Sequence, residues 1–267
     1  MRVWVMPLAL LALAVCVTQS VAQRHAARAP QVVPMRAAQV DPGQLARRLA
    51  DQQPGWPRSR RFDCARIKCV ALTFDDGPGE HTGRLLDLLA QRHVRATFFV
   101  IGEMVAADRD GRLVRRIAQE GHELGNHSWS HPALAALSEE GVRRELRQTG
   151  DLVQRLTGVR MRLMRPPYGA TDAQVAAEAR REGLAQILWS LDTLDWRDRV
   201  TATVARRAET ATPGAIVLMH DVHRTTVDAV PQVLDTLARK GFTFVTVSEL
   251  YGRALVPGRE YLERDPR

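Results

Sequence analysis

The segment Val70–Pro78 reads VALTFDDGP: an apolar run, then two adjacent aspartates and a Gly-Pro turn. A short apolar run that ends in turn residues is typical of a buried β-strand. Such a strand brings Asp75 and Asp76 together at its carboxyl end, where two like charges need a cation between or beside them. An ordinary Asp-Gly turn that closes a strand is the alternative, and the rest of the sequence has to decide between the two.

A strand-then-helix pattern repeats from Cys64 onward. We predict seven strands, at Cys69–Thr73, Ala96–Ile101, Glu123–Asn126, Met161–Arg165, Gln186–Ser190, Ala215–Met219 and Phe242–Thr246. Each is followed by a predicted helix or helical turn, at Thr82–His93, Gly111–Glu120, Ser138–Thr157, Asp172–Glu182, Thr201–Thr210, Thr225–Lys240 and Ser248–Tyr251.

Repeated β-α units predict an α/β fold with a parallel sheet and right-handed crossovers. The repeating part is about 190 residues long, slightly short of a full eight-unit barrel. We therefore expect a distorted, incomplete (β/α) barrel of about seven parallel strands, with its active site at the carboxyl-terminal rim. A doubly wound open sheet is the alternative.

The positive charge is concentrated at the N-terminal end of the chain. Residues 1–61 hold nine arginines and two aspartates, which account for +7 of the formal net charge of +8. The remainder is almost neutral, so we expect no nucleic acid among the partners of the folded part. With 45% hydrophobic residues, the 267-residue chain has the composition of one globular domain with appendages.

The sequence divides into four expected segments. Residues 1–22 have the charged start, apolar run and small final residues of a secretory signal peptide, with a retained membrane anchor as the alternative. Residues 23–63 form a basic, proline-containing linker that we expect to be mostly disordered. Residues 64–252 are the expected folded domain, and 253–267 a C-terminal tail.

This layout predicts a protein that is secreted or associated with the cell envelope after the signal is cleaved. We expect a monomer whose basic linker favours an anionic cell wall or membrane surface. A solvated spacer without a partner is the alternative for the linker.

Two cysteines, Cys64 and Cys69, remain in the exported chain. An oxidising compartment permits a disulfide between them, closing a short loop before the first strand. Two free thiols are the alternative. The sequence offers no second cysteine pair that would complete a zinc knuckle.

Polar clusters follow five of the predicted strands. They are Asp75-Asp76, Asn126–His131, Arg165–Gly169, Asp192–Trp196 and His220-Asp221. Because the carboxyl ends of parallel strands share one rim, these clusters are expected to converge, and active sites are built at such rims. Chance would scatter them over both ends.

His127 and His131 stand four residues apart, a spacing that can put two imidazoles on one face. With one strand-end aspartate they form a His-His-Asp set that leaves positions open for water. A divalent metal would supply the cation that the aspartate pair needs and would lower the pKa of water. Taken alone, a His-x-x-x-His spacing is more often structural.

The second aspartate would remain free to act as a general base. His220 is the candidate acid for the leaving group, kept cationic by Asp195. We expect Arg165 to orient the base by a bidentate contact and a backbone N–H near Tyr168 to hold the oxyanion. Each residue also has a structural interpretation: Arg165 as a salt bridge, His220 as a buried histidine, Trp196 as core.

The motifs occur in a specific order. They are TFDDG at 73–77, HSWSH at 127–131, RPPY at 165–168, DTLDW at 192–196 and LMH at 218–220. In this order the chain resembles the polysaccharide deacetylases of carbohydrate esterase family 4, the NodB-homology domain, over Lys68–Tyr251. The resemblance implies a distorted (β/α) barrel and a metal-dependent hydrolase that removes acetyl groups from sugar polymers.

Carried over by position, the resemblance assigns five catalytic residues. Asp75 is the base and Arg165 holds it. Tyr168 lends the oxyanion donor and also contacts the substrate. Asp195 tunes His220, which is the acid.

The resemblance also assigns a cofactor and a pocket. Asp76, His127 and His131 bind one divalent metal ion, most often Zn²⁺, with Co²⁺ or Ni²⁺ as other candidates. Trp196 and Leu218 wall the pocket for the acetyl group.

The expected substrate is an acetylated polysaccharide. An exported protein with a basic tether suits peptidoglycan, so we expect hydrolysis of N-acetyl groups on its N-acetylglucosamine residues; a chitooligosaccharide deacetylase and an acetylxylan esterase are alternatives. A non-catalytic carbohydrate-binding relic of the fold is an alternative of another class, against which the intact Asp75 and His220 argue. A cell-envelope interaction protein would depend on the linker alone.

Overall fold

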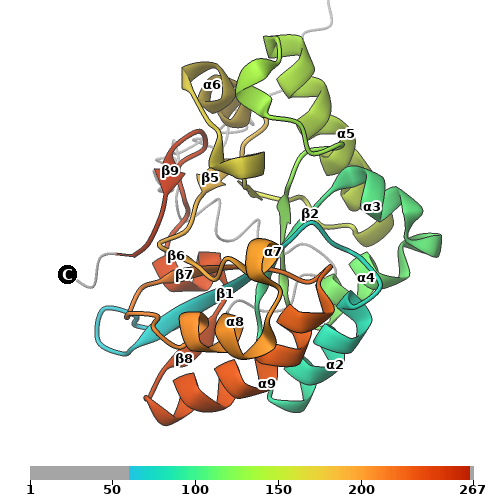
Figure 1. Cartoon of the computed structure of the whole chain (residues 1–267). Coiled ribbons are helices and arrows are strands. Elements are labelled where there is room, and N and C mark those ends of the chain that lie inside the picture. Colours follow the sequence, from blue (N-terminus) through green and yellow to red (C-terminus); the bar gives the residue numbers. More distant parts are fainter. Residues whose placement is uncertain (1–59, 265–267) are drawn as a thin grey trace, which may run out of the picture. The chain divides into compact units, whose positions relative to one another are not determined.

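Strand β1 (Cys69–Asp75) lies at the centre of a parallel sheet in the computed structural model, which describes residues 60–264 (Figure 1). All seven residues of β1 are buried. It pairs with β2 (Thr97–Val100), β7 (Ile216–His220) and β8 (Thr243–Val245), all in parallel. The apolar stretch before the aspartates is thus the strand around which the fold is built.

The described sheet has nine strands in the order β6-β7-β1-β2-β3-β4-β5-β9, with β8 paired to β1 off this path. The further strands are β3 (Glu123–Asn126), β4 (Leu163–Met164), β5 (Ala185–Ile187), β6 (Leu191–Asp192) and β9 (Glu260–Tyr261). Every strand pairing in the sheet is parallel. The predicted incomplete, distorted (β/α) barrel is confirmed, and the open-sheet alternative is not what forms.

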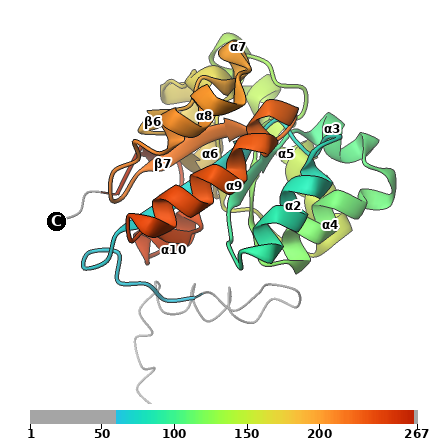
Figure 2. The same ribbon diagram turned by 60° about the horizontal axis from the view of Figure 1, so that its bottom comes forward.

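Helices follow the strands as the pattern predicted. They are α2 (Thr82–Gln91), α3 (Gly102–Ala107), α4 (Arg112–Gln119), α5 (Glu139–Thr157), α6 (Ala173–Arg181), α7 (Asp195–Asp198), α8 (Thr201–Ala208), α9 (Arg224–Arg239) and α10 (Val247–Tyr251). Figure 2 shows α9 running between α8 and α2, and both neighbours contact it. Short 3₁₀ turns lie at Arg109–Gly111, Leu134–Ala136 and Pro167–Gly169.

Local capping explains where the long helix α5 begins and ends. The Ser138 hydroxyl accepts a hydrogen bond from the Gly141 N–H, and acidic residues fill the first turn. Gly158, at φ 76°, ends the helix in the left-handed conformation that glycine adopts without steric penalty. These signals are local, so the predicted range Ser138–Thr157 matches the structure closely.

Alternation along β1 decides which side chains enter the barrel. Val70, Leu72 and Phe74 belong to the larger core between sheet and helices, whereas Ala71 belongs to a smaller core on the other face. Asp75 shares the parity of Ala71. The strand therefore directs Asp75 into the barrel at its carboxyl end.

Some sequence expectations need correction. About seven strands were predicted, but β6 and β9 are additional; both have two residues, too few for a periodic pattern. The expected tail, 253–267, contributes a strand to the sheet: β9 pairs with β5, and Glu263 forms an isolated bridge with Ala215, just before β7. Helices α3 and α7 were also not predicted.

The predicted disulfide between Cys64 and Cys69 is present. The expected signal peptide and all of the linker before Arg60 lie outside the described residues. Arg60 itself contacts the domain through the carboxylate of Glu249. Within residues 60–264, none of the helices combines the length and apolar character needed to cross a bilayer.

Candidate active site

The end of β1 presents two aspartates in different environments. Asp75 is 2% exposed and continues the strand into the barrel. Asp76 follows with φ 72°, a left-handed conformation that ends the strand. Gly77 then passes so close to the Asp221 carboxylate that a Cβ there would lie 2.6 Å from Oδ1. The turn therefore requires a residue without a side chain at position 77.

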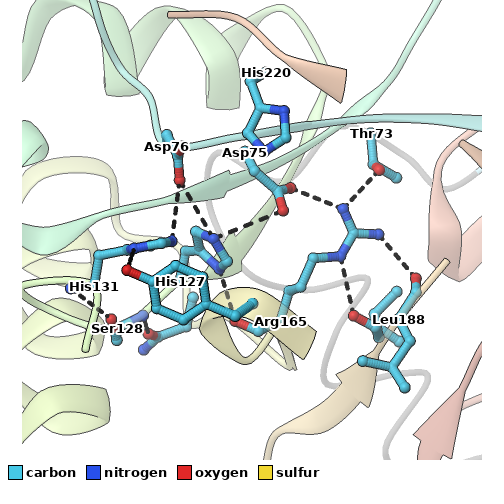
Figure 3. Close-up of polar contacts among 12 residues, drawn as sticks. Thr73, Asp75, Asp76, His127, Ser128, His131, Arg165, Leu188 and His220 are labelled. Carbon is cyan, nitrogen blue, oxygen red and sulfur yellow. Dashed lines mark hydrogen bonds and ion pairs between the residues drawn. The ribbon is translucent and has the colours of Figure 1, made fainter. Parts of the chain in front are cut away.

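Asp76, His127 and His131 converge on one point (Figure 3). Both histidine Nε2 atoms lie 3.4 Å from Asp76 Oδ1, and the three ligand atoms lie within 4.8 Å of one another. Oδ1 of Asp76 is buried and accepts no hydrogen bond within the described chain. An orphaned carboxylate oxygen facing two imidazoles is a donor set that fits a divalent ion such as zinc.

The opposite ring nitrogens of both histidines are engaged elsewhere. His127 Nδ1 lies 2.7 Å from the Arg165 carbonyl, and His131 Nδ1 lies 3.2 Å from Tyr168 Oη. A metal-ligating histidine normally donates its other N–H to such an acceptor, which fixes its tautomer. Both Nε2 atoms are thereby left to face Asp76.

Charge at this cluster favours metal binding. Burial alone would raise the pKa of Asp76, but the interaction with His127 and the charges of His220 and His131 lower it to about 2. Burial and the neighbouring His127 lower the pKa of His131. An anionic aspartate and a neutral imidazole are the protonation states that ligate a cation.

Arg165 holds Asp75 from inside the barrel. The arginine is fully buried, and its Nη1 donates to Asp75 Oδ1 and Thr73 Oγ1, both at 2.8 Å. Its Nε and Nη2 donate to the carbonyls of Ile187 (3.0 Å) and Leu188 (2.9 Å). The bidentate contact predicted with Asp75 is therefore wrong: the second half of the guanidinium binds the end of β5.

The Arg165 guanidinium also lies over the Phe99 ring, 4.2 Å from its centroid, with Trp189 at 5.6 Å. Burial lowers the pKa of Arg165, and the charge of Asp75 opposes that effect. With hydrogen bonds on three of its nitrogens and a ring against its face, this side chain has one defined position. Its hydrogen bond to Oδ1 therefore fixes the position of the Asp75 carboxylate.

His220 and Asp195 form a second pair at the end of β7. His220 Nδ1 lies 2.8 Å from Asp195 Oδ1, and Asp195 Oδ2 accepts from the His220 N–H and the Thr226 hydroxyl, both at 2.7 Å. Burial alone would lower the pKa of His220, but the hydrogen bond and charge of Asp195 raise it to about 9. Figure 3 shows the His220 ring directed toward Asp75.

The three residues predicted to contact the substrate differ in how far they are exposed to solvent and in the element that carries them. Trp196 is 47% exposed at the start of α7, directly after Asp195. Leu218 is 4% exposed and shares the parity of Ile216 and His220 on β7, so it faces the barrel interior. Tyr168 is 71% exposed, with φ 61°.

Several residues around the site carry no predicted role. Asp221 is fully buried, hydrogen-bonds the Thr82 hydroxyl, and has a pKa that burial raises to about 7. The sequence could have indicated that Asp221 lies at the site, because it places Asp221 in the same polar cluster as His220. Glu145, on α5, and the rings around Arg165 carry no local signal of any kind.

A sequence profile described as polysaccharide deacetylase matches residues 63–187. The chain belongs to this family, carbohydrate esterase family 4, and has its barrel fold.

Particular relatives are similar over most of the domain. The peptidoglycan-N-acetylglucosamine deacetylase PgdA of Listeria monocytogenes is 44% identical over 199 residues, 74% of this chain but 42% of that protein. The chitin deacetylase of Colletotrichum lindemuthianum is 38% identical over 206 residues, 72% of this chain and 83% of that one. A solved structure, T48 deacetylase with substrate, superposes with a TM-score of 0.71 at 42% identity, covering 75% of this chain and 99% of that chain. The chain thus spans less than half the length of the Listeria relative.

Proposed function

We propose that this protein is an exported, metal-dependent deacetylase that hydrolyses the N-acetyl groups of N-acetylglucosamine residues in peptidoglycan. One observation carries the proposal. The buried pair Asp75–Arg165 and the pair His220–Asp195 face the same Asp76-His127-His131 set. Amide hydrolysis needs a base, an acid and an electrophile at one point.

Asp76, His127 and His131 would hold the ion, and Zn²⁺ suits their nitrogen and oxygen donors, with Co²⁺ or Ni²⁺ as other candidates. When bound, the ion would polarise the acetyl carbonyl and lower the pKa of water in the site. The Arg165 carbonyl, which can only accept, keeps His127 in the ligating tautomer, and the Tyr168 hydroxyl contacts His131 Nδ1 and leaves Nε2 free to ligate.

Asp75 would take a proton from the attacking water while the water oxygen bonds to the acetyl carbonyl carbon. Arg165 keeps the carboxylate in place through the 2.8 Å contact to Oδ1, leaving Oδ2 on the side of His127, 3.7 Å from its Nε2. The backbone N–H of Tyr168 would donate to the developing oxyanion.

His220 would donate a proton to the nitrogen as the C–N bond breaks, which releases acetate and a free amine on the sugar. A pKa of about 9 keeps the imidazole cationic at neutral pH. Asp195 fixes Nδ1, so Nε2 is the atom that carries this proton. Trp196 and Leu218, with Tyr168, would bound the space for the acetyl group.

Peptidoglycan is favoured over chitin oligosaccharides and acetylxylan for two reasons. The Listeria relative is named for that substrate. The excess of arginine in residues 1–61 favours an anionic wall. We further propose that residues 1–22 direct export, that 23–63 tether the domain, and that the protein acts as a monomer in the cell envelope.

Acetate release by the chain from Gln23 onward tests the proposal. Peptidoglycan, chitin oligosaccharides and acetylxylan are each offered with Zn²⁺, with a chelator, and to the Asp75→Asn variant. Chelator-sensitive release from peptidoglycan, absent in the variant, is the expected result. No release from any substrate by a folded, metal-loaded protein would favour the non-catalytic carbohydrate-binding alternative.

A further inference from the structure

The five-residue segment His127–His131 joins the two histidines of the proposed metal site through an unfavourable backbone. Ser128 has φ 66° and His131 has φ 60°. Residues other than glycine rarely adopt this left-handed conformation, and they keep it only when the surroundings enforce it. Something outside the loop must therefore hold it.

One side of the loop is held by the start of α3. The N–H groups of Gly102 and Glu103 donate to the carbonyls of Ser128 and Trp129, each at 3.0 Å. Gly102 also lies so close to Trp129 that a Cβ there would meet the indole at 2.3 Å. These contacts occupy the carbonyls of Ser128 and Trp129, and the Ser128 N–H donates to Asn126 Oδ1 at 2.9 Å, which leaves the N–H groups of Trp129 and Ser130.

The other side is held by one carboxylate on α5. Glu145 Oε2 accepts from the N–H groups of Trp129 and Ser130, both at 2.8 Å, and Oε1 accepts from the Ser130 hydroxyl at 3.0 Å. In the part of the chain that the structure describes, every side-chain hydrogen bond of Glu145 goes to this loop. An ionised acceptor makes these bonds stronger than neutral ones would be.

The two histidines depend on this clamp to different degrees. His127 follows β3 directly, and its side chain is 3% exposed. His131 lies at the far end of the loop, its side chain is 25% exposed, and its N–H donates to Ser128 Oγ at 3.0 Å. A loosened loop would therefore displace His131 much more than His127.

We propose that Glu145 is a positioning residue for the metal site. It acts through the backbone N–H groups of Trp129 and Ser130. By holding these, it keeps Ser128 and His131 in the left-handed conformation that sets His131 Nε2 beside Asp76. The inference rests on the proposed function only in taking Asp76, His127 and His131 as metal ligands. Glu145 itself contacts neither the ion nor the substrate.

Zinc affinity of the metal-free protein is the test, measured by competition with a chromophoric chelator. We expect Glu145→Ala to raise the Kd for Zn²⁺ about 10- to 100-fold, the usual range for groups that orient a ligand. Glu145→Gln retains one acceptor oxygen and should fall between the alanine variant and the wild type. Asp151→Ala, which removes an exposed carboxylate from the same helix, is the matched control and should leave the Kd unchanged.

A second readout separates positioning from general stability. The Co²⁺-loaded Glu145→Gln protein should show an altered visible absorption band, because the ligand geometry changes, while the melting temperature of the metal-free protein stays near that of the wild type. If Glu145→Ala does not fold, the glutamine variant decides alone.

The outcomes distinguish the inference from the proposed function. Wild-type zinc affinity and an unchanged cobalt band in folded Glu145 variants would overturn the positioning role and leave the metal site intact. Failure of the wild-type protein to bind Zn²⁺, or full zinc binding by His131→Ala, would overturn the ligand set and the inference with it.

Discussion

The two ends of the sheet hold the same kinds of buried ionisable side chain in opposite states. At the carboxyl end, His220 has a pKa raised to about 9 and Asp76 a pKa lowered to about 2. At the amino end, burial and nearby arginines lower the pKa of His122 to about 3, and burial raises the pKa of Glu123. His220 and Asp76 retain their charge at one end, whereas His122 and Glu123 lose theirs at the other.

His122 and Glu123, at the amino end, satisfy their polar atoms with neutral partners. His122 Nδ1 accepts from the Ala96 N–H at 3.1 Å. Glu123 Oε2 accepts from the Thr97 hydroxyl at 3.1 Å and the Ser248 N–H at 3.0 Å, and Oε1 accepts from the Ser248 hydroxyl. Both carboxylate oxygens of Glu123 therefore have partners within the fold, unlike Asp76 Oδ1.

The carboxyl end leaves atoms without partners and accepts backbone strain. Asp76 Oδ1 is orphaned in the described chain. Six of the eight described non-glycine residues with positive φ lie here: Asp76, Ser128, His131, Tyr168, Leu194 and Arg199. Burial of a titratable group is common to both ends, whereas an unpaired atom in a strained turn distinguishes the proposed active site.

The largest expected effect is at Asp75. Replacing it by asparagine removes the proposed base, and acetate release should fall about 1000-fold, within the range for general-base catalysis. Metal content should stay near that of the wild type, because Asp76 and both histidines are intact. Loss of zinc from Asp75→Asn would mean that the roles of the two aspartates are exchanged. Glu123→Gln, at the amino end, is the matched control and should retain turnover.

His131→Ala should remove most of the bound metal and lower acetate release about 100-fold, since two ligands rarely retain a divalent ion. Elemental analysis of the purified protein and the release assay measure the two effects together. His122→Ala is the comparison at the other end, expected to alter stability and leave metal content unchanged. A metal-replete, active His131→Ala would contradict the ligand assignment.

Asp195→Asn should shift the pH profile. Because His220 must be protonated to act as an acid, kcat/KM of the wild type is expected to fall as the pH rises through about 9. Without the Asp195 charge, only the charges of Asp75 and Asp76 oppose the lowering of the His220 pKa by burial, so the alkaline limb should move down by at least about one unit. Thr226→Val removes a neutral hydrogen-bond donor to the same aspartate and should shift the alkaline limb less. An unmoved limb in Asp195→Asn would exclude His220 as the acid.

Much of the fold was predictable because its signals are local. The run before Asp75 is fully buried, and α5 carries its own caps. Strand β9 carries no such signal: it exists because Glu260 and Tyr261 pair with Gln186 and Ile187, far away in the sequence. Two residues cannot show periodicity, so only the tertiary structure places them in the sheet.

The residues of the candidate site likewise fall into two groups: those that the sequence predicts and those that only the tertiary structure brings to the site. Residues at the carboxyl ends of strands or directly after them, such as Asp75, His127 and His220, were predictable because parallel topology sends strand ends to one rim. Glu145 was not, since it is one of several acidic residues on α5 and differs from Glu140 only in what the fold brings to it. The single-nitrogen contact of Arg165 with Asp75 likewise depends on the carbonyls at the end of β5, which no motif encodes.

The smallest effect on activity is expected at Glu249, on the amino-terminal side of the sheet. Its carboxylate accepts from Arg60 Nε (3.1 Å) and Nη2 (3.0 Å), and Oε1 lies 3.7 Å from Arg95 Nη1. Glu249→Gln keeps the shape but removes the negative charge that the Arg60 guanidinium contacts through both carboxylate oxygens, so urea denaturation should show a loss of about 1–3 kcal/mol in the free energy of unfolding. Turnover and zinc affinity should stay at wild-type values. The same Glu-to-Gln change at Glu145 should do the reverse, weakening zinc binding with little effect on the metal-free fold. A Glu249→Gln variant that lost turnover while keeping its stability would show that the two ends of the sheet are coupled, and the division between them would fail.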